Sequence, residues 1–236
     1  MRIQPEVHRR LSKARGVIFD MDGTLIDSES VYCIAWQAAL EEQGLFISKQ
    51  FYAENFAGRK NEACEAILEE LFKGKMDLPA YKVRWRHLWE HHVKGCGLPL
   101  KPGAIDLLSL IAGRGMPIAL ATSTPYQDML KSLGPANLIH RFQAIVTGDD
   151  LPSERGKPYP DVFLRASGQL GLRAQDCLVF EDSEPGIRAA HAAGTIPIMV
   201  PDLKQPTPEV RGIAALVLPS LLDGAKILLD IWDTTA

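Results

Sequence analysis

Val17-Ile18-Phe19-Asp20-Met21-Asp22-Gly23-Thr24-Leu25 joins a run of three apolar residues to two carboxylates and a glycine. The apolar run predicts a strand that is buried on both faces of a sheet, and the carboxylates stand where that strand ends. In open α/β sheets, ligands bind just beyond the carboxyl ends of the strands. Two like charges so close together repel each other, and a bound cation is the usual remedy. The stretch therefore predicts a central strand whose end binds a cation.

Strand-like and helix-like segments alternate from about residue 100 to residue 200. The expected strands are short and apolar, at 117–122, 144–147, 177–180 and 196–200, and the expected helices lie at 103–114, 127–133, 161–170 and 185–193. Such alternation favours right-handed βαβ units and a mostly parallel sheet. We therefore expect a doubly wound, Rossmann-like α/β fold with residues 17–19 as its central strand. Four prolines in 197–208 predict an irregular loop after the last of these strands.

Residues 30–98 break this alternation. They contain three helix-like segments, at 30–43, 61–72 and 79–93, and no convincing strand. Three helices in succession suggest a small helical domain inserted after the first strand. We therefore expect residues 1–29 and 99–236 to form the sheet-bearing domain and residues 30–98 to form the insertion.

Composition and charge exclude several classes of protein. With 46% hydrophobic and 23% charged residues, the chain of 236 residues can bury a sizeable core. The net charge of −3 gives no electrostatic reason to expect nucleic acid or an anionic membrane as a partner. No apolar run approaches the length that spans a membrane. The first 15 residues carry five basic side chains without an apolar signal core, which favours a short, frayed extension over a targeting peptide.

The cysteines indicate a reducing compartment. Cys33, Cys64, Cys96 and Cys177 are far apart and form no CxxC pair. This spacing predicts reduced thiols of a cytoplasmic protein rather than a disulfide framework or a zinc site.

Polar side chains follow three more of the expected strands. The run 118–124 ends in three hydroxyl residues, whose hydroxyls and backbone amides suit an anion. Lys157 lies between a glycine and two spaced prolines, and its ammonium can offset the charge of nearby carboxylates. The run 177–182 ends in Glu181 and Asp182, which offer the hard oxygen ligands that Mg²⁺ prefers. Together, the four strand ends predict one site.

Each of these patterns taken alone has a purely structural alternative. The hydroxyl run can cap a helix, Lys157 can be a solvated loop residue, and adjacent acids can favour a helix N-terminus. The run 87–91, HLWEH, fits a zinc-protease pattern, but no third ligand suggests itself. Trp85 and Trp89 are one helical turn apart, which is more typical of packing than of a ligand platform.

Asp20-Met21-Asp22-Gly23-Thr24-Leu25 resembles the first motif of the haloacid dehalogenase superfamily, most of whose members are Mg²⁺-dependent phosphatases. The three later runs are similar, in order, to the remaining motifs of that superfamily. The resemblance covers nearly the whole chain and implies a Rossmann-like core interrupted after its first strand by a helical cap of type 1.

The resemblance also implies roles for single residues. Asp20 would attack phosphorus, and Asp22 would protonate the departing oxygen and then activate water. Thr122 would hold a phosphoryl oxygen, and Lys157 would bridge Asp20 and the phosphoryl group. Magnesium would be bound by the side chains of Asp20 and Asp182, by the backbone carbonyl of Asp22, and by Glu181 directly or through water.

Two features indicate which branch of the superfamily the chain resembles. The acid at Asp22 favours phosphate-ester chemistry, because the dehalogenases do not need it and the phosphonate-cleaving relatives lack it. The nearest resemblance is to the β-phosphoglucomutase-like branch, which contains sugar phosphomutases and many phosphatases of small metabolites. In the mutase a histidine follows the first motif, and Tyr32 stands at that position here, which favours hydrolysis over the alternative of a sugar phosphomutase.

We expect the substrate to be a small phosphate ester, either a sugar, a nucleoside or a polyol phosphate. Gly23, Thr24 and Ser123 are expected near the phosphoryl group. The loop 58–60 is expected to meet the leaving group through Arg59 and Lys60, with Glu29 at the hinge, although an ordinary surface loop is the equal alternative. Neither nucleic acid nor a membrane is expected as a partner, and the chain should be a monomer or a weak homodimer.

Overall fold

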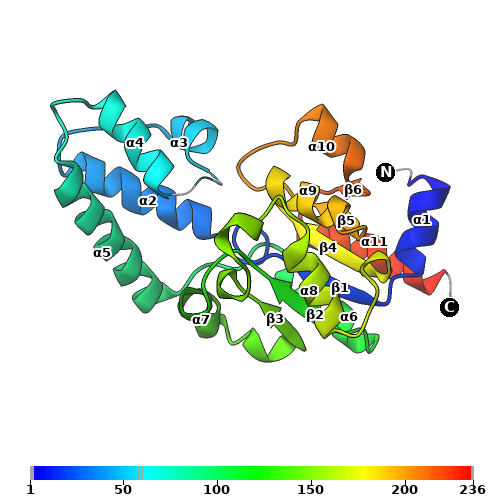
Figure 1. Ribbon diagram of the computed structural model, residues 1–236. Coiled ribbons are helices and arrows are strands. Elements are labelled where there is room, and N and C mark those ends of the chain that lie inside the picture. The colour runs from blue at the N-terminus through cyan, green and yellow to red at the C-terminus, as the bar shows by residue number, and fades with distance from the viewer. Residues whose placement is uncertain (1–2, 58, 60, 235–236) are drawn as a thin grey trace.

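The computed structural model describes residues 3–57, 59 and 61–234 and contains a 6-stranded sheet with helices on both faces (Figure 1). The strands are β1 (Gly16–Phe19), β2 (Ile118–Ala121), β3 (Ala144–Val146), β4 (Cys177–Glu181), β5 (Ile196–Met199) and β6 (Leu216–Val217). The α-helices are α1 (Pro5–Ser12), α2 (Ser28–Glu41), α3 (Lys49–Asn55), α4 (Asn61–Leu71), α5 (Leu78–Cys96), α6 (Ala104–Gly113), α7 (Tyr126–Leu133), α8 (Asp161–Gln169), α9 (Glu184–Ala192), α10 (Pro208–Ile213) and α11 (Leu221–Asp233).

The sheet is parallel throughout, with the strand order β3-β2-β1-β4-β5-β6. β1 lies between β2 and β4, and all four of its residues are buried, as its uninterrupted apolar sequence predicts. The chain steps outward from β1 to β3 on one side, and then returns to β4 and steps outward on the other. The predicted doubly wound α/β fold is confirmed, and the reversal between β1 and β4 is the place where such folds bind ligands.

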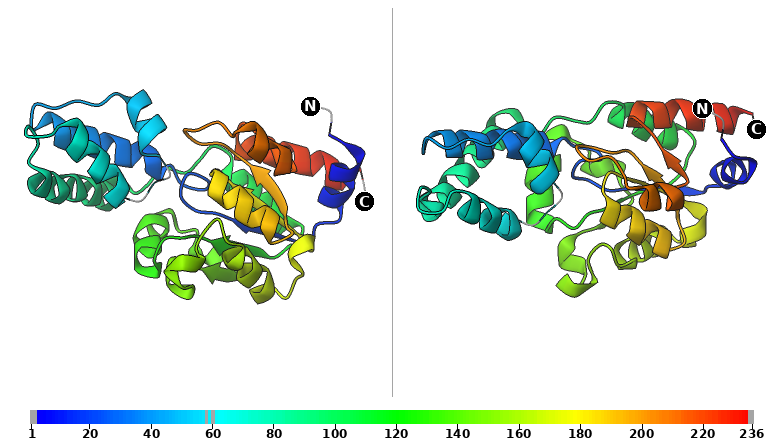
Figure 2. Two further views of the ribbon diagram at one scale, coloured as in Figure 1. Left: turned by 45° about the horizontal axis from the view of Figure 1, so that its top comes forward. Right: turned by 90° about the horizontal axis from the view of Figure 1, so that it is seen from above.

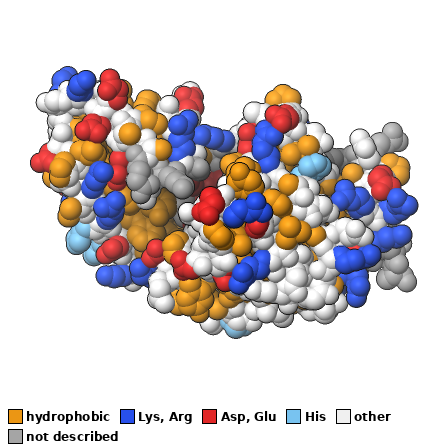
Figure 3. Space-filling model, viewed as in Figure 1, with side chains coloured by type: hydrophobic (Ala, Val, Ile, Leu, Met, Phe, Trp, Pro, Cys, Tyr) orange, Lys and Arg blue, Asp and Glu red, His pale blue; other side chains and the backbone are white. Residues whose placement is uncertain are grey.

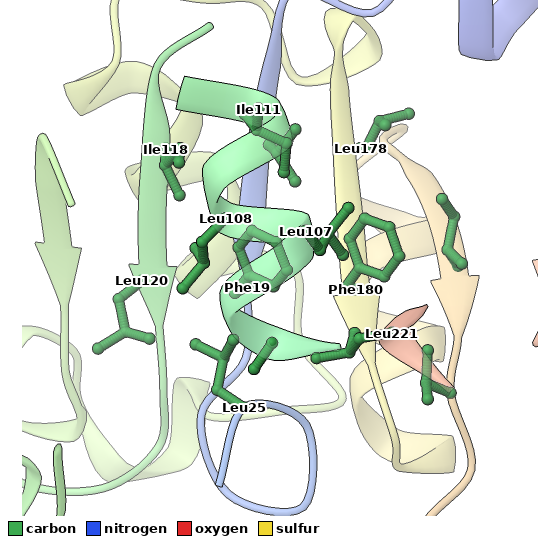
Figure 4. Packing of buried hydrophobic residues seen from close by; sticks show 14 of the residues in the cluster. Phe19, Leu25, Leu107, Leu108, Ile111, Ile118, Leu120, Leu178, Phe180 and Leu221 are labelled. Atoms are coloured by element: carbon green, nitrogen blue, oxygen red, sulfur yellow. The ribbon is translucent and has the colours of Figure 1, made fainter. Parts of the chain in front are cut away.

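Side chains of β1 alternate between two apolar clusters on opposite faces of the sheet. Val17 and Phe19 pack with residues of α6 and α11, whereas Ile18 packs with residues of α8 and α9. These two pairs of helices cover opposite faces of the sheet (Figure 2). Phe19 stacks on Phe180 of β4, with ring centroids 5.2 Å apart, and Leu107 of α6 lies beside both (Figure 4). Because burying one Leu or Phe side chain contributes about 1.5–3 kcal/mol, this packing holds the ends of β1 and β4 firmly side by side.

Helices α2 to α5 form a group of their own beyond the carboxyl ends of the strands (Figure 1). They share an apolar cluster that is rich in aromatic rings, with Trp36, Tyr81 and Trp85 among its buried members. The sequence predicted three helices here, and the structure adds α3. Its seven residues are too few to show a helical period, and its start is marked by Ser48, whose side chain accepts a hydrogen bond from the backbone of Phe51 at 3.0 Å.

Two neighbouring crossings connect the helical group to the sheet. The backbone N–H of Asp27 donates to the carbonyl of Pro99 at 2.8 Å, and that of Lys101 donates to the carbonyl of Leu25 at 2.9 Å. The outgoing and returning segments are thus hydrogen-bonded to each other, next to the carboxylates that follow β1.

Residues 3–15 differ from the frayed extension that the sequence predicts. They include α1, whose Leu11 is fully buried against the sheet-bearing part of the chain. The indole N–H of Trp232 in α11 donates to the carbonyl of Leu11 at 3.1 Å, and the Arg10 guanidinium donates to the carbonyl of Thr195 at 3.0 Å. The prediction was wrong because the partners of this helix lie near the other end of the chain, where no local pattern points to them.

The end of the chain completes the sheet. An irregular loop follows β5, as the prolines predict, and leads to α10, the two-residue strand β6 and α11.

Cys33, Cys64 and Cys177 are free and buried, in agreement with the predicted reduced thiols, while the Cys96 side chain lies outside the described part. Within the described ranges, no helix has the length and apolar character needed to cross a bilayer.

Candidate active site

The carboxyl ends of β1 and β4 bring three acidic side chains together. The pairing of Phe19 with Phe180 sets Asp20 beside Glu181, and the backbone N–H of Asp20 donates to the carbonyl of Phe180 at 3.0 Å. Asp182 follows directly. Carboxylate oxygens of Asp20, Glu181 and Asp182 all lie within 4.8 Å of one another, so the cluster has the spacing of a cation site.

Lys157 enters this cluster from the segment before α8. Its ammonium donates to Oδ1 of Asp20 in a very short contact and to Oε1 of Glu181 at 2.8 Å. Its side chain is only 8% exposed. One buried cation therefore offsets part of the charge of three carboxylates, which leaves the cluster with excess negative charge.

The pKa values of the carboxyl groups report that excess. Burial, together with the charges of Glu181 and Asp22, raises the pKa of Asp20 to about 7, although Lys157 acts in the opposite direction. Burial and the charges of Glu181, Asp20 and Asp202 raise the pKa of Asp182 well above its ordinary value. A further cation would relieve this repulsion.

Gly23 and Thr24 lie against Asp182. Gly23 has a φ of 78°, and a Cβ there would stand 2.5 Å from Oδ2 of Asp182, so only glycine allows this approach. The buried Thr24 hydroxyl donates to Oδ1 of Asp182 at 3.2 Å. Both residues thus orient the acidic cluster, and their contact with substrate stays a prediction.

Asp22 is held by hydroxyl groups on a different side of the site. Thr124 Oγ1 donates to Oδ2 of Asp22 at 2.7 Å, and the Ser28 side chain is also hydrogen-bonded to Asp22. Thr122, which is buried at the end of β2, accepts from the backbone N–H of Thr124 at 3.0 Å. Burial raises the pKa of Asp22, and the hydrogen bonds from Thr124 and Ser28 act against that rise.

The hydrogen bonds from Thr124 and Ser28 to Asp22 were not predicted from the sequence. Thr124 belongs to the run 118–124, which ends in three hydroxyl residues, so a role at the site could have been inferred from the sequence. Ser28 carried no signal, because its position depends on the turn that leads into α2.

Both oxygens of Glu181 are already engaged. Oε1 accepts from Lys157, and Oε2 accepts from the backbone N–H of Ser183 at 2.6 Å and from its hydroxyl at 2.9 Å. Gly186 makes room for this arrangement, since a Cβ at that position would lie 1.8 Å from Oε1 of Glu181. Ser183 and Gly186 are therefore further residues that shape the site, and no sequence pattern pointed to them.

A cleft opens beside these groups, between the helical group and α7 (Figure 3). It has a volume of about 1150 Å³, and Asp22, Ser123, Glu29 and Arg59 line it. A smaller hollow of about 650 Å³ meets Asp182 and shares Glu29 and Arg59 with the cleft. The expected substrate contacts Ser123, Glu29 and Arg59 thus line the cleft, whereas Gly58 and Lys60 fall outside the described residues.

Glu29 already has a partner in the helical group. Its carboxylate accepts from the Tyr52 hydroxyl at 2.9 Å.

The zinc pattern around His87 and His91 gains no support, because the one group of three metal-ligating side chains found among the described residues is the acidic cluster at the strand ends.

The fold and the site define a class of protein. A parallel α/β sheet presents, at its reversal point, a carboxylate pair, a buried lysine and further acids beside a large cleft, which is the arrangement of an enzyme that works on an anionic group. Residues 14–194 match the profile of the haloacid dehalogenase-like hydrolases. The chain belongs to this family and is a hydrolase of the haloacid dehalogenase type.

Individual relatives agree with this assignment. A Drosophila melanogaster protein named "probable pseudouridine-5'-phosphatase" is 35% identical over 218 residues, which cover 90% of this chain and 92% of the relative. The phosphorylated carbohydrates phosphatase of Thermotoga maritima is 32% identical over 75% of this chain and 81% of its own length. The crystal structure of a HAD family hydrolase from Deinococcus radiodurans, with bound phosphate and sodium, is 25% identical, covers 93% of this chain and 97% of that one, and superposes with a TM-score of 0.78.

Proposed function

We propose that this hydrolase is a Mg²⁺-dependent phosphatase that acts on a small phosphorylated metabolite through an aspartyl-phosphate intermediate. The observation that carries the proposal is the meeting of Asp20, Glu181 and Asp182 with Lys157 at the carboxyl ends of β1 and β4. Asp22 lies two residues after Asp20, near enough for its charge to raise the pKa of Asp20. Phosphatases named among the relatives, with different small substrates, support the reaction class without choosing a substrate.

Asp20 and Asp22 divide the reaction between them. An oxygen of the Asp20 carboxylate attacks phosphorus, and the bond from phosphorus to the leaving-group oxygen breaks. The Asp22 carboxyl gives its proton to that departing oxygen. It then takes a proton from the water that attacks the aspartyl-phosphate, which releases inorganic phosphate and restores Asp20. The raised pKa of Asp22 supports a proton on this residue at the start.

Lys157 and the hydroxyl residues hold the reacting groups in place. The ammonium of Lys157 already contacts Asp20, and it would also offset charge on the phosphoryl oxygens. Thr124 keeps the Asp22 carboxyl oriented. Thr122 and Ser123 remain the predicted contacts of a phosphoryl oxygen, which the turn after β2 would complete with its backbone N–H groups.

The acidic cluster fits magnesium by the chemistry of its donors. Asp20 and Asp182 offer hard oxygens at ligand spacing, and the backbone carbonyl of Asp22 lies in the same loop. Glu181 is engaged by Lys157 and Ser183, which supports contact through water rather than direct binding. When bound, Mg²⁺ would neutralise charge on the phosphoryl group as it is transferred.

We propose further that residues 30–98 are a cap domain hinged on the two crossings, with residues 1–29 and 99–236 as the catalytic core. The separate aromatic cluster of α2 to α5 supports this division, as do the paired backbone hydrogen bonds at the crossings. Closing such a cap would exclude water from the strand ends and bring Arg59 and Glu29 toward the leaving group. We retain Lys60 as a predicted contact of the leaving group, and it lies outside the described residues.

The proposal is tested by phosphate release. Sugar phosphates, nucleoside monophosphates, glycerol phosphate and pseudouridine 5'-phosphate should be offered with Mg²⁺ and with chelator. We expect release from one or a few compounds that chelator abolishes. Asp20→Asn should retain the fold by circular dichroism and lose turnover, whereas Asp106→Asn, exposed on α6, should retain turnover.

Two outcomes would contradict the proposal. Appreciable hydrolysis by Asp20→Asn would remove the nucleophile. Interconversion of hexose 1- and 6-phosphates without phosphate release would assign the chain to the mutases instead.

A further inference from the structure

The wall of the cleft that faces Asp22 is built from aromatic rings. Tyr32 of α2 stacks on Trp89 of α5, with ring centroids 5.3 Å apart and an interplanar angle of 16°. Trp85 meets Tyr32 edge-on at 6.1 Å. All three rings line the cleft of about 1150 Å³, as do Asp22 and Thr124.

Tyr32 and Trp89 pack against the aromatic cluster of the helical group from its edge and also line the cleft. Trp36 and Trp85 fill its interior and are 2% and 3% exposed, but Tyr32 and Trp89 are only half-buried at its edge. No hydrogen bond to the Tyr32 hydroxyl is found among the described residues. Burial and the charges of Asp22, Glu29 and Asp128 raise the pKa of Tyr32, so this hydroxyl remains a donor at neutral pH.

Charge in the cleft argues against a second phosphate group on the substrate. Its described basic residues are Arg59, Arg86, Lys94 and Lys131, and its described acidic residues, four as well, are Asp22, Glu29, Glu90 and Asp128. Two of the cations are already paired, Lys131 with Asp128 at 2.7 Å and Arg86 with Glu65 at 3.5 Å. A wall of aromatic rings with no excess positive charge suits a large, uncharged, flat group.

We propose that Tyr32 and Trp89 form the binding site for a planar heterocycle on the leaving group, so that the preferred substrates are nucleoside 5'-monophosphates. The inference rests on the proposed phosphatase function and adds a substrate class to it. A base stacks on any exposed aromatic face, and the cleft is larger than a glycerol or glycolate ester requires. Trp85 and Trp89, expected from their spacing only to pack, thus divide their roles: Trp85 supports the wall and Trp89 presents a face.

The test compares three phosphate esters that differ only at the position of the base. Ribose 5-phosphate has the same phosphate ester as uridine and adenosine 5'-monophosphates but no heterocycle. In wild type, kcat/KM for at least one nucleotide should exceed that for ribose 5-phosphate by about tenfold or more. In Trp89→Leu and Tyr32→Leu this ratio should fall toward one, by roughly fivefold or more, which corresponds to the loss of one base-stacking contact.

Matched variants separate stacking from general damage. Tyr32→Phe keeps the ring and should keep most of the ratio. Phe46→Leu removes an aromatic ring of the helical group that is 65% exposed and does not line the cleft, so its ratio should equal that of wild type. Binding of uridine 5'-monophosphate and ribose 5-phosphate to Asp20→Asn by calorimetry gives the same comparison without turnover.

The outcomes distinguish the two proposals. If ribose 5-phosphate is hydrolysed as well as both nucleotides, or if Trp89→Leu and Tyr32→Leu leave the ratio unchanged, the base site is wrong and the phosphatase stands. If no compound is hydrolysed, the phosphatase fails, and calorimetry alone decides the base site: equal affinity for the two compounds overturns it.

Discussion

At the scale of single residues, two glycines allow the acidic cluster to form. Gly23 lets the loop that follows β1 pass beside Asp182, and Gly186 lets the first turn of α9 pass beside Glu181. Neither position tolerates a methyl group without moving a carboxylate. The geometry of the site therefore depends on two residues that carry no functional group.

Gly186→Ala should damage both stability and activity. Its new Cβ would stand 1.8 Å from Oε1 of Glu181, which must move and release Lys157. We expect a loss of about 1–3 kcal/mol in the free energy of unfolding by urea denaturation, as for other overpacked sites, and a fall in kcat. Gly168→Ala in α8, where a Cβ meets nothing within 4 Å, is the matched control and should be neutral or stabilise by about 0.5–1 kcal/mol. Equal effects of the two substitutions would refute the steric argument.

Thr124→Val should change the pH dependence of turnover. The Thr124 hydroxyl lowers the pKa of Asp22, so its removal should raise that pKa further. Because Asp22 must be protonated to act as the acid, the alkaline limb of the kcat profile should move to higher pH. At saturating Mg²⁺ we also expect kcat to fall by about tenfold, since the carboxyl loses an orienting bond. Thr124→Ser should restore the wild-type profile, and a valine variant with an unmoved alkaline limb would rule out this role.

At the scale of elements, the sequence predicted what local patterns determine. The strands β1, β2, β3, β4 and β5 are apolar runs with polar ends, and the helices that alternate with them have a clear period. Asp20, Asp22 and Lys157 were found for the same reason, because each lies in a short run with a chemical meaning. Ser28, Ser183 and Gly186 were not, because their roles arise only when distant backbone segments meet.

Helix α1 shows the same limit in the fold. Its partner α11 is separated from it by most of the chain, so the one buried leucine among basic residues carried no local signal.

Leu11→Ala tests whether α1 belongs to the folded core. Leu11 is fully buried in the cluster that also contains Trp232, so its truncation should cost about 2–5 kcal/mol of unfolding free energy. Arg9→Ala on the exposed face of α1 removes only a solvent-exposed ion pair with Glu6 and should cost less than about 1 kcal/mol. Urea denaturation of both variants decides the question. A Leu11→Ala variant as stable as wild type would show that the segment is a frayed extension and not part of the folded core.

At the scale of the whole molecule, the carboxylates at the carboxyl ends of β1 and β4 repel one another, and a bound cation would relieve this repulsion. Asp20 has its pKa raised from 3.8 to about 7, so the metal-free fold binds a proton there more tightly than the unfolded chain does. The stability that this proton contributes is fully present below about pH 4 and is lost as the pH rises through 7. Asp182 acts in the same direction. The fold without a cation should therefore become less stable from acid to neutral pH at this site.

Magnesium should reverse that trend, because it binds the deprotonated carboxylates and competes with protons for them. We expect millimolar Mg²⁺ to raise the melting temperature by several degrees at pH 8 and by much less at pH 5, since a ligand of the folded state stabilises by about 2.7 kcal/mol at one hundred times its dissociation constant. Asp182→Asn should lose most of the gain at pH 8, whereas Asp106→Asn on the exposed face of α6 should keep it. A gain of equal size at both pH values would show that Mg²⁺ acts elsewhere on the protein. If Asp182→Asn keeps the full rise in melting temperature at pH 8, Asp182 is not a ligand of the metal, and Asp20 is then the remaining ligand to test.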